Sequence, residues 1–340
     1  MINLSVLECT GEDAQDFLHN QLTQSVKDLN TQHARLFAYC SPRGRVLANG
    51  LLWKGANQPD QFFLAVHESV ADILQQRLQM YVLRSKVKIK RLDEARVFSG
   101  YQGVSNNTSA QADKTNHQPE STTNVHQNGQ EQALGDSWSL YIQHDKKNKN
   151  LLSIQAPATH LNPERFWLIC LNKEASEQIP NSAIIDKNAW VLDDLMLGLV
   201  WINKAISEVF LPQNINLDIL PAVNFSKGCF PGQEVVARSH YRATIRRRAV
   251  LAKLEPMPEL NNECFSSVDL VMQPEEGKEP RIAGRIANAV KANDALWLLA
   301  ETNLDFILEE TPLYIANHLD NAITIEKLPF QKQLPWEKKK

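Results

Sequence analysis

The chain has 340 residues, a hydrophobic content of 43% and a formal net charge of −3. This length exceeds one ordinary domain, so two or three compact units with their own cores are expected. The near-neutral net charge excludes a global attraction to nucleic acid or to an anionic membrane, so a nucleic-acid partner would have to bind a local positively charged patch. Because no apolar run approaches the roughly 20 residues that span a bilayer, no membrane partner is predicted.

The cysteines are scattered, odd in number and without CxxC spacing. This pattern argues against a zinc site and a disulfide framework, and it favours a reducing compartment. The N-terminal residues lack the basic start and apolar core of a signal peptide. We therefore expect a soluble cytoplasmic protein with no metal site. The cysteines are Cys9, Cys40, Cys170, Cys229 and Cys264.

Residues 1–95 are predicted to form an N-terminal α+β domain. A capping box at Thr10 and Asp13 introduces a helix with apolar residues at helical spacing. Two apolar runs flank Ser41-Pro42-Arg43-Gly44, whose proline and glycine suit a type I turn, so a β-hairpin is expected there. A second helix begins at Ser69, and a half-buried strand follows. The apolar runs are 36–40 and 46–53, and the strand is 87–90.

Residues 96–240 are predicted to form a second α+β domain that contains an insertion. The segment 102–137 is rich in Gln, Asn, Ser and Thr and has no aromatic residue. It cannot recover the entropy lost on ordering, so it is predicted to be a disordered insertion. Strands are expected at 138–142 and 165–170, followed by a helix that carries Trp190.

Residues 241–335 contain several short apolar runs separated by turn residues. Such spacing predicts short strands that form a small β-barrel or sandwich. The expected strands are 249–254, 268–272, 282–289, 295–300 and 323–327.

The segment 227–234 reads KGCFPGQE and places one thiol, that of Cys229, between two glycines. A cysteine is most often a small buried hydrophobe, and that interpretation stays open. The glycines Gly228 and Gly232 instead favour a backbone that approaches a ligand closely. Cationic side chains of Lys227 and Arg238 would lower the thiol pKa if they lie near it, and the thiolate is the nucleophilic form.

Two further groups of residues can each be interpreted either as part of a binding site or as ordinary structure. Gln233 and Glu234 present the donors and acceptors that bind a heterocycle, but an acidic residue here also suits the start of a helix. The segment 238–248 contains five arginines and no acidic residue. It is either a solvated face or a binding site for the carboxylates of a ligand or for RNA phosphates.

At this point the residues resemble a known family. The stretch KGCFPGQEVVAR at 227–238 is similar to the signature of the YgfZ family. These are folate-binding proteins that resemble the aminomethyltransferase (T-protein) of the glycine cleavage system. The segments 17–23 and 211–217 also resemble parts of that family. The resemblance covers most of the chain outside 102–137.

The resemblance implies an α+β protein with a three-domain arrangement around a central channel and a small C-terminal β-barrel. It implies a folate-binding accessory protein that supports iron–sulfur proteins and tRNA modification by methylthiolation, with tetrahydrofolate or a derivative as cofactor. Folate and iron–sulfur enzymes such as tRNA methylthiolation enzymes are the implied partners, and direct tRNA contact through Arg238–Arg248 is a further expectation. The implied reactive thiol is Cys229. The implied folate-binding residues are Trp190, Lys227, Gly228, Gln233, Glu234 and Arg238.

Two departures from the family pattern bear on the reaction. A second folate-associated tryptophan is expected near the N-terminus, where this chain has Leu4. The glycine-cleavage enzyme has an acidic residue just after the first hairpin turn, where this chain has Ala48-Asn49. An amide cannot accept a proton as a carboxylate does. A folate-dependent aminomethyltransferase or demethylase therefore remains the alternative, and whether the protein is an enzyme stays open.

Overall fold

The structure is a computed structural model that describes residues 3–101, 140–179, 186–242, 245–255, 265–273, 279–316 and 318–329. The expected insertion at 102–137 lies outside the described residues, as do Cys264 and the end of the expected barrel segment beyond residue 329.

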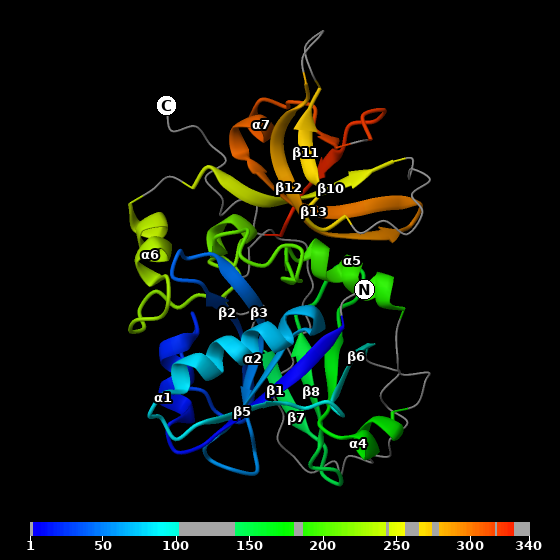
Figure 1. Cartoon of the computed structure of the whole chain (residues 1–340). Coiled ribbons are helices and arrows are strands. Elements are labelled where there is room, and N and C mark those ends of the chain that lie inside the picture. Colours follow the sequence, from blue (N-terminus) through cyan, green and yellow to red (C-terminus); the bar gives the residue numbers. More distant parts are fainter. Residues whose placement is uncertain are drawn as a thin grey trace, which may run out of the picture.

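The described residues build two antiparallel sheets, one of nine strands and one of six. The six-stranded sheet lies above the nine-stranded sheet in Figure 1, with α5 and neighbouring loops between them. The fold is therefore mixed α+β, as expected.

Strands from the first 95 residues occupy one side of the nine-stranded sheet, in the order β5-β1-β4-β3-β2. Helix α1 (Ala14–Gln21) precedes β2, and α2 (Glu68–Val82) crosses in front of the sheet (Figure 1). The five strands are β1 (Leu4–Thr10), β2 (His33–Cys40), β3 (Val46–Lys54), β4 (Gln61–His67) and β5 (Lys88–Arg91).

The sheet continues through β7, which pairs with β2 at Ala34↔Leu140 and His33↔Tyr141. The order then runs β7-β8-β9-β6. The predicted boundary between residues 95 and 96 therefore falls between strands of one continuous sheet. These strands are β6 (Arg96–Tyr101), β7 (Leu140–His144), β8 (Leu151–Ala156) and β9 (Arg165–Cys170).

The connecting region carries short helices and then the cysteine motif. Its elements are α4 (Lys173–Glu177), α5 (Lys187–Met196), the 3-10 helix η3 (Pro212–Ile215) and α6 (Gln233–Tyr241). Helix α5 packs on the second sheet through β12 and β13. This region therefore joins the two sheets.

The second sheet has the order β14-β11-β12-β13-β10-β15. Short strands were predicted for this part of the chain and are confirmed, whereas closure into a barrel stays a prediction. The elements are β10 (Arg247–Leu254), β11 (Asp269–Met272), β12 (Arg281–Ala292), β13 (Ala295–Asn303), α7 (Leu304–Leu308), β14 (Tyr314–Ile315) and β15 (Thr324–Glu326).

Alternating side chains of β3 enter two different cores. Leu51 and Trp53 belong to the core shared with β7–β9 and α5, whereas Leu52 belongs to the core under α2. This follows from the two-residue period of a strand, which sends successive side chains to opposite faces. Helix α2 contributes Leu74 and Leu78 to the second core. Both faces of the first sheet are therefore covered.

The hairpin predicted around residues 41–44 is confirmed. Strands β2 and β3 pair antiparallel, and the Gly44 amide donates to the Ser41 carbonyl over 2.8 Å. The predicted capping box at Thr10 is wrong. Asp13 is the N-cap residue of α1, and its carboxylate accepts a hydrogen bond from the Lys86 amide at 2.7 Å instead of capping the helix.

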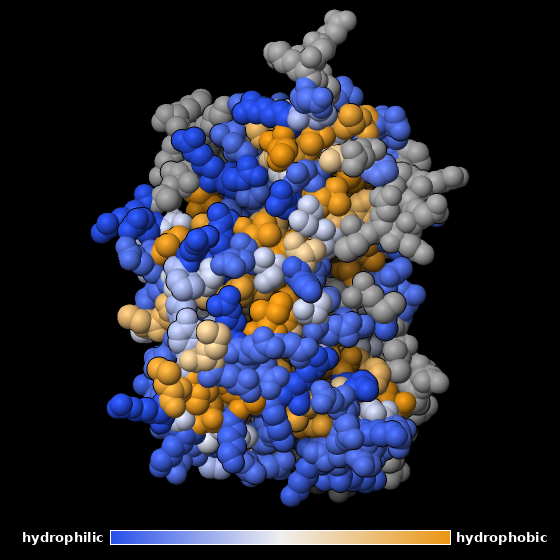
Figure 2. Space-filling model, viewed as in Figure 1, coloured by the Kyte–Doolittle hydropathy of each residue, from blue (hydrophilic) through white to orange (hydrophobic). Residues whose placement is uncertain are grey.

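Helix α2 begins one residue earlier than predicted, at Glu68. The ring of His67 takes the capping role, and its Nδ1 accepts a hydrogen bond from the Ser69 amide at 3.2 Å. At the other end of α2, Met80, Tyr81 and Leu83 are exposed. Figure 2 shows apolar residues at the lower left of the molecule, where this end of the helix lies in Figure 1. Within the described ranges, no helix is long and apolar enough to cross a membrane.

Candidate functional site

The cysteine motif forms a loop that ends in α6. Gly232 is the N-cap residue of this helix and has a φ of 79°, which an L side chain rarely adopts. A Cβ atom on Gly232 would lie 2.3 Å from the Ser41 carbonyl oxygen and 2.7 Å from the Gly44 Cα. The start of α6 is thus packed directly on the turn of the first hairpin, and Gly232 is needed for that packing.

Gly228 has different surroundings. A Cβ atom on it would meet nothing within 4 Å, and the residue is exposed beside Cys229. The two motif glycines therefore do different things. Gly232 permits a backbone contact inside the protein, and Gly228 leaves open space next to the thiol.

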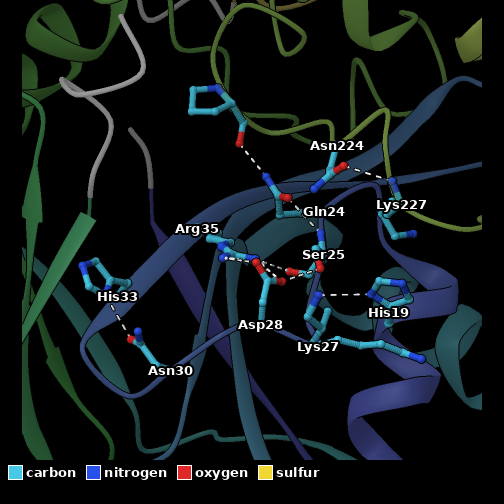
Figure 3. A network of polar contacts seen from close by, with 12 residues as sticks. His19, Gln24, Ser25, Lys27, Asp28, Asn30, His33, Arg35, Asn224 and Lys227 are labelled. Atoms are coloured by element: carbon cyan, nitrogen blue, oxygen red, sulfur yellow. Dashed lines mark hydrogen bonds and ion pairs between the residues drawn. The ribbon is translucent and has the colours of Figure 1, made fainter.

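The loop before the motif is anchored to the segment that follows α1. Thr23 Oγ1 donates to the Ala222 carbonyl at 2.7 Å, and the Asn224 amide donates to the Thr23 carbonyl at 2.9 Å. Gln24 Nε2 donates to a second loop carbonyl at 2.7 Å. Figure 3 shows the side chain of Gln24 reaching this loop. Within the loop, Asn224 Oδ1 accepts from the Lys227 amide at 3.0 Å. The network fixes the backbone just ahead of Cys229.

The amine of Lys227 is held between the segment that follows α1 and a ring of its own loop. Its Nζ donates to the Leu22 carbonyl at 2.8 Å and lies 4.8 Å from the centre of the Phe230 ring. Burial lowers the pKa of Lys227 from 10.5 to about 8, and the neighbouring Cys229 partly opposes this shift. The motif therefore places a partly desolvated amine next to a thiol. The pKa of His19 is also lowered, by burial first and by Lys227 second.

Cys229 differs from the other cysteines that the structure describes. It is exposed, whereas Cys9, Cys40 and Cys170 are buried. Burial raises the pKa of Cys9 and Cys40 to about 12 and that of Cys170 to about 11. Among these four cysteines, only Cys229 is accessible to a ligand or another protein. Cys229 is therefore not the small buried hydrophobe that one interpretation of the sequence expected.

Gln233 and Glu234 form the first turn of α6. Glu234 accepts a hydrogen bond from Arg238 one turn later, at 2.5 Å, and both side chains are exposed. An acidic residue here also interacts favourably with the positive end of the helix. The structure thus brings Lys227, Gly228, Gln233, Glu234 and Arg238 together with Cys229 on one loop and helix.

The arginine segment does not form one solvated face, because Arg248 is buried. Arg248 pairs with both carboxylate oxygens of Asp218, at 2.7 and 2.9 Å. Arg247 pairs with both oxygens of Glu301, each at 2.6 Å. These acidic partners come from other parts of the chain and could not be seen in the local composition. Arg242 and Arg246 remain exposed.

Trp190 lies away from the motif, since α5 and α6 are on opposite sides of the molecule in Figure 1. Its side chain is only 3% exposed and packs edge-on against Trp167, with ring centres 5.7 Å apart. The guanidinium of Arg165 lies 4.0 Å from the ring centre and pairs with Asp194 at 2.6 Å. This position matches a core tryptophan, and its folate role stays a prediction.

Asn49 has a structural role on β3. Its Nδ2 donates to the Val200 carbonyl at 2.7 Å, and its Oδ1 accepts from the Ile202 amide at 2.8 Å. A carboxylate could not donate the first of these bonds. Sequence reasoning missed this bridge, because its partner lies 151 residues away.

The chemistry of the motif residues suits a folate. Lys227 and Arg238 would supply cations for a glutamate tail, and Gln233 and Glu234 would supply donors and acceptors for the edge of a pterin. The open space beside Gly228 leaves room for a ligand to approach the backbone. Trp190 does not fit a stacking role in this arrangement, because its ring is enclosed by other side chains.

No family model matches the chain. The tRNA-modifying protein YgfZ of Edwardsiella ictaluri (strain 93-146) is 27% identical over 337 residues, which cover 95% of this chain and 89% of that relative. The tRNA-modifying protein YgfZ of Yersinia pestis (strain Pestoides F) is 26% identical over 334 residues, covering 96% and 90%.

A solved structure shares the fold. The aminomethyltransferase T of the glycine cleavage system from Bartonella henselae superimposes with a TM-score of 0.63, covering 97% of this chain and 85% of that one, at 14% sequence identity. At this identity the likeness shows the fold alone. The predicted resemblance to the YgfZ proteins is confirmed, and the chain is similar to them over nearly its whole length.

Proposed function

We propose that the protein is a folate-binding accessory factor that supports iron–sulfur proteins and tRNA modification, including methylthiolation. Its reactive group is the thiol of Cys229. The observation that carries the proposal is the exposure of Cys229 beside Lys227, on a loop fixed by the network of Figure 3. Relatives named as tRNA-modifying proteins support the link to tRNA. We place the protein in the cytoplasm, where such a thiol stays reduced.

The thiol and the amine form the reactive part of the site. Because the Lys227 Nζ is held by the Leu22 carbonyl, the charge keeps a fixed place relative to the loop. The anchored backbone from Thr23 to Asn224 holds the thiol toward solvent, where another protein can reach it.

Tetrahydrofolate or a derivative is the proposed cofactor, and when bound it would supply a one-carbon unit. The proposed binding residues are those carried by the motif. A role for Trp190, which the family resemblance implies, would require its enclosed ring to become accessible to the folate. We further propose three domains, at 1–95, 96–240 and 241–335, around a central channel, with the last domain closing into a barrel. Its six-stranded sheet and the shared fold of the aminomethyltransferase support this arrangement.

The alternative, a folate-dependent aminomethyltransferase or demethylase, has less support. Asn49 stands where the enzyme relatives carry a carboxylate, and its amide bonds to the backbone of Val200 and of Ile202. No proton acceptor is available from this residue. The shared fold does not favour the enzyme, because fold alone does not specify the reaction.

The proposal is tested in cells that lack their own copy of the gene. A plasmid carrying the wild-type chain should restore the activity of iron–sulfur enzymes, and Cys229→Ala should not. Cys170→Ala is the matched control, because this buried cysteine lies outside the motif. Equal rescue by Cys229→Ala would contradict the proposed role of the thiol.

A titration of the purified protein with tetrahydrofolate tests the cofactor. Intrinsic fluorescence should change on binding, and comparison with Trp190→Phe shows whether that ring senses the ligand. Loss of affinity in Arg238→Gln would support binding at the motif. Affinity unchanged in both Arg238→Gln and Lys227→Met would contradict it.

A further inference from the structure

Three aromatic rings meet at the end of α6, next to the cysteine loop. The rings of Phe225 and His240 stack with centres 3.7 Å apart and an interplanar angle of 15°. Tyr241 contacts both rings edge-on, at 6.1 Å from Phe225 and 4.8 Å from His240. Its side chain is 67% exposed. The stack therefore supports a tyrosine that presents its ring to solvent.

Exposed arginines lie beside this ring. Residues three and four positions apart share a helix face, so Arg238 lies on the same face as Tyr241 and Arg242. Arg238 is paired with Glu234. Arg242 and Arg246 are exposed, and neither forms an ion pair with a residue that the structure describes. The surface around Tyr241 therefore combines one supported aromatic ring with the exposed arginines Arg238 and Arg242. Arg246 is also exposed and directly precedes β10.

This combination is suited to single-stranded RNA. Bases stack on exposed aromatic rings whatever their sequence, while arginines bind the phosphates between them. The end of α2, where Met80 and Leu83 are exposed, offers an apolar protein partner a larger apolar contact than the end of α6 does. A ring flanked by cations favours a base and its phosphates instead.

We propose that Tyr241, supported by Phe225 and His240, is a stacking platform for an unpaired RNA base, with Arg242 and Arg246 binding the adjacent phosphates. This inference rests on the proposed role in tRNA modification and names the part of the RNA that the protein contacts. The platform is built from Phe225, which precedes Cys229 on the loop, and from the end of α6, so a bound RNA would occupy the same loop and helix as the thiol.

Fluorescence anisotropy of a labelled single-stranded RNA of about eight nucleotides, a length within the usual site size, tests the platform on the full-length protein. Tyr241→Leu should weaken binding about fivefold or more, since one stacked base contributes at least about 1 kcal/mol. Tyr241→Phe should keep the wild-type affinity. Tyr141→Leu is the matched control. Tyr141 is likewise an exposed tyrosine, at 49%, and its ring centre lies 4.9 Å from that of the His33 ring.

The salt dependence tests the arginines. Replacing Arg242 and Arg246 by glutamine should reduce the slope of log K against log salt by about 1.4, or roughly 0.7 for each phosphate contact. Equal affinities of Tyr241→Leu and wild type would overturn the inference. So would displacement of the RNA by tetrahydrofolate, which would assign the ring to folate. The assay contains no iron–sulfur protein, so its result does not depend on the role of Cys229.

Discussion

Replacing Gly232 by alanine should separate the cysteine motif from the hairpin that supports it. The new Cβ would lie 2.3 Å from the Ser41 carbonyl oxygen and 2.7 Å from the Gly44 Cα, both backbone atoms. Neither atom can move aside without moving the hairpin turn, whose own bond joins Ser41 and Gly44 at 2.8 Å. The start of α6 must therefore shift outward.

The magnitude follows from two costs. A residue with a side chain in the left-handed region loses roughly 1–2 kcal/mol relative to glycine. Overpacking a close contact costs about 1–3 kcal/mol more. We expect Gly232→Ala to lower the free energy of unfolding by about 3 kcal/mol, which corresponds to a fall in Tm of roughly 5 °C or more for a chain of this size.

The assay is thermal and urea unfolding of the purified protein, with Gly228→Ala as the matched control. The control lies four residues earlier, and its Cβ would meet no atom within 4 Å. Its stability should stay within about 0.5 kcal/mol of wild type. Equal losses in the two variants, or no loss in Gly232→Ala, would refute the proposed packing of α6 on the hairpin turn.

Three further predictions concern buried charge and the thiol. Asp218→Asn should lower the free energy of unfolding by about 3–5 kcal/mol, because it leaves the Arg248 guanidinium buried and unpaired; a loss below about 1 kcal/mol in urea unfolding would contradict this. Iodoacetamide should label Cys229 well before Cys40 in the native protein, as measured by peptide mass spectrometry, and equal rates would contradict the assigned exposures. Between pH 8 and 10.5 the wild type should gain stability relative to Lys227→Met. The pKa of Lys227 is about 8 in the folded state and 10.5 in the unfolded state, so the unfolded state binds more protons in this range. Parallel curves of stability against pH for the two proteins would argue against this burial of the amine.

Local signals in the sequence predicted much of the fold. The proline and glycine of the turn at 41–44 and the apolar runs beside it indicated the hairpin, because the turn geometry depends on those residues alone. The short strands of the C-terminal sheet were found in the same way. Helix starts were less certain, because an acid near a helix start can bind elsewhere, as Asp13 does with Lys86.

Contacts between distant segments could not be predicted. The need for glycine at 232 comes from the turn at 41–44, nearly two hundred residues earlier. The burial of Arg248 depends on Asp218, which lies outside the arginine segment, so the local charge pattern suggested a solvated face. The motif itself located the candidate site, including the Lys227 amine, and the structure added the anchoring network and the aromatic stack around it.

The most direct test of the account is the amount of methylthiolated nucleoside in tRNA from cells whose only copy of this protein is a chosen variant. Quantitative mass spectrometry of digested tRNA provides the measurement. The account predicts that Cys229→Ala lowers the methylthiolated fraction to the level of cells without the protein, while Cys170→Ala keeps the wild-type level. A wild-type level in Cys229→Ala, with the protein present in normal amount, would contradict the central role of this thiol.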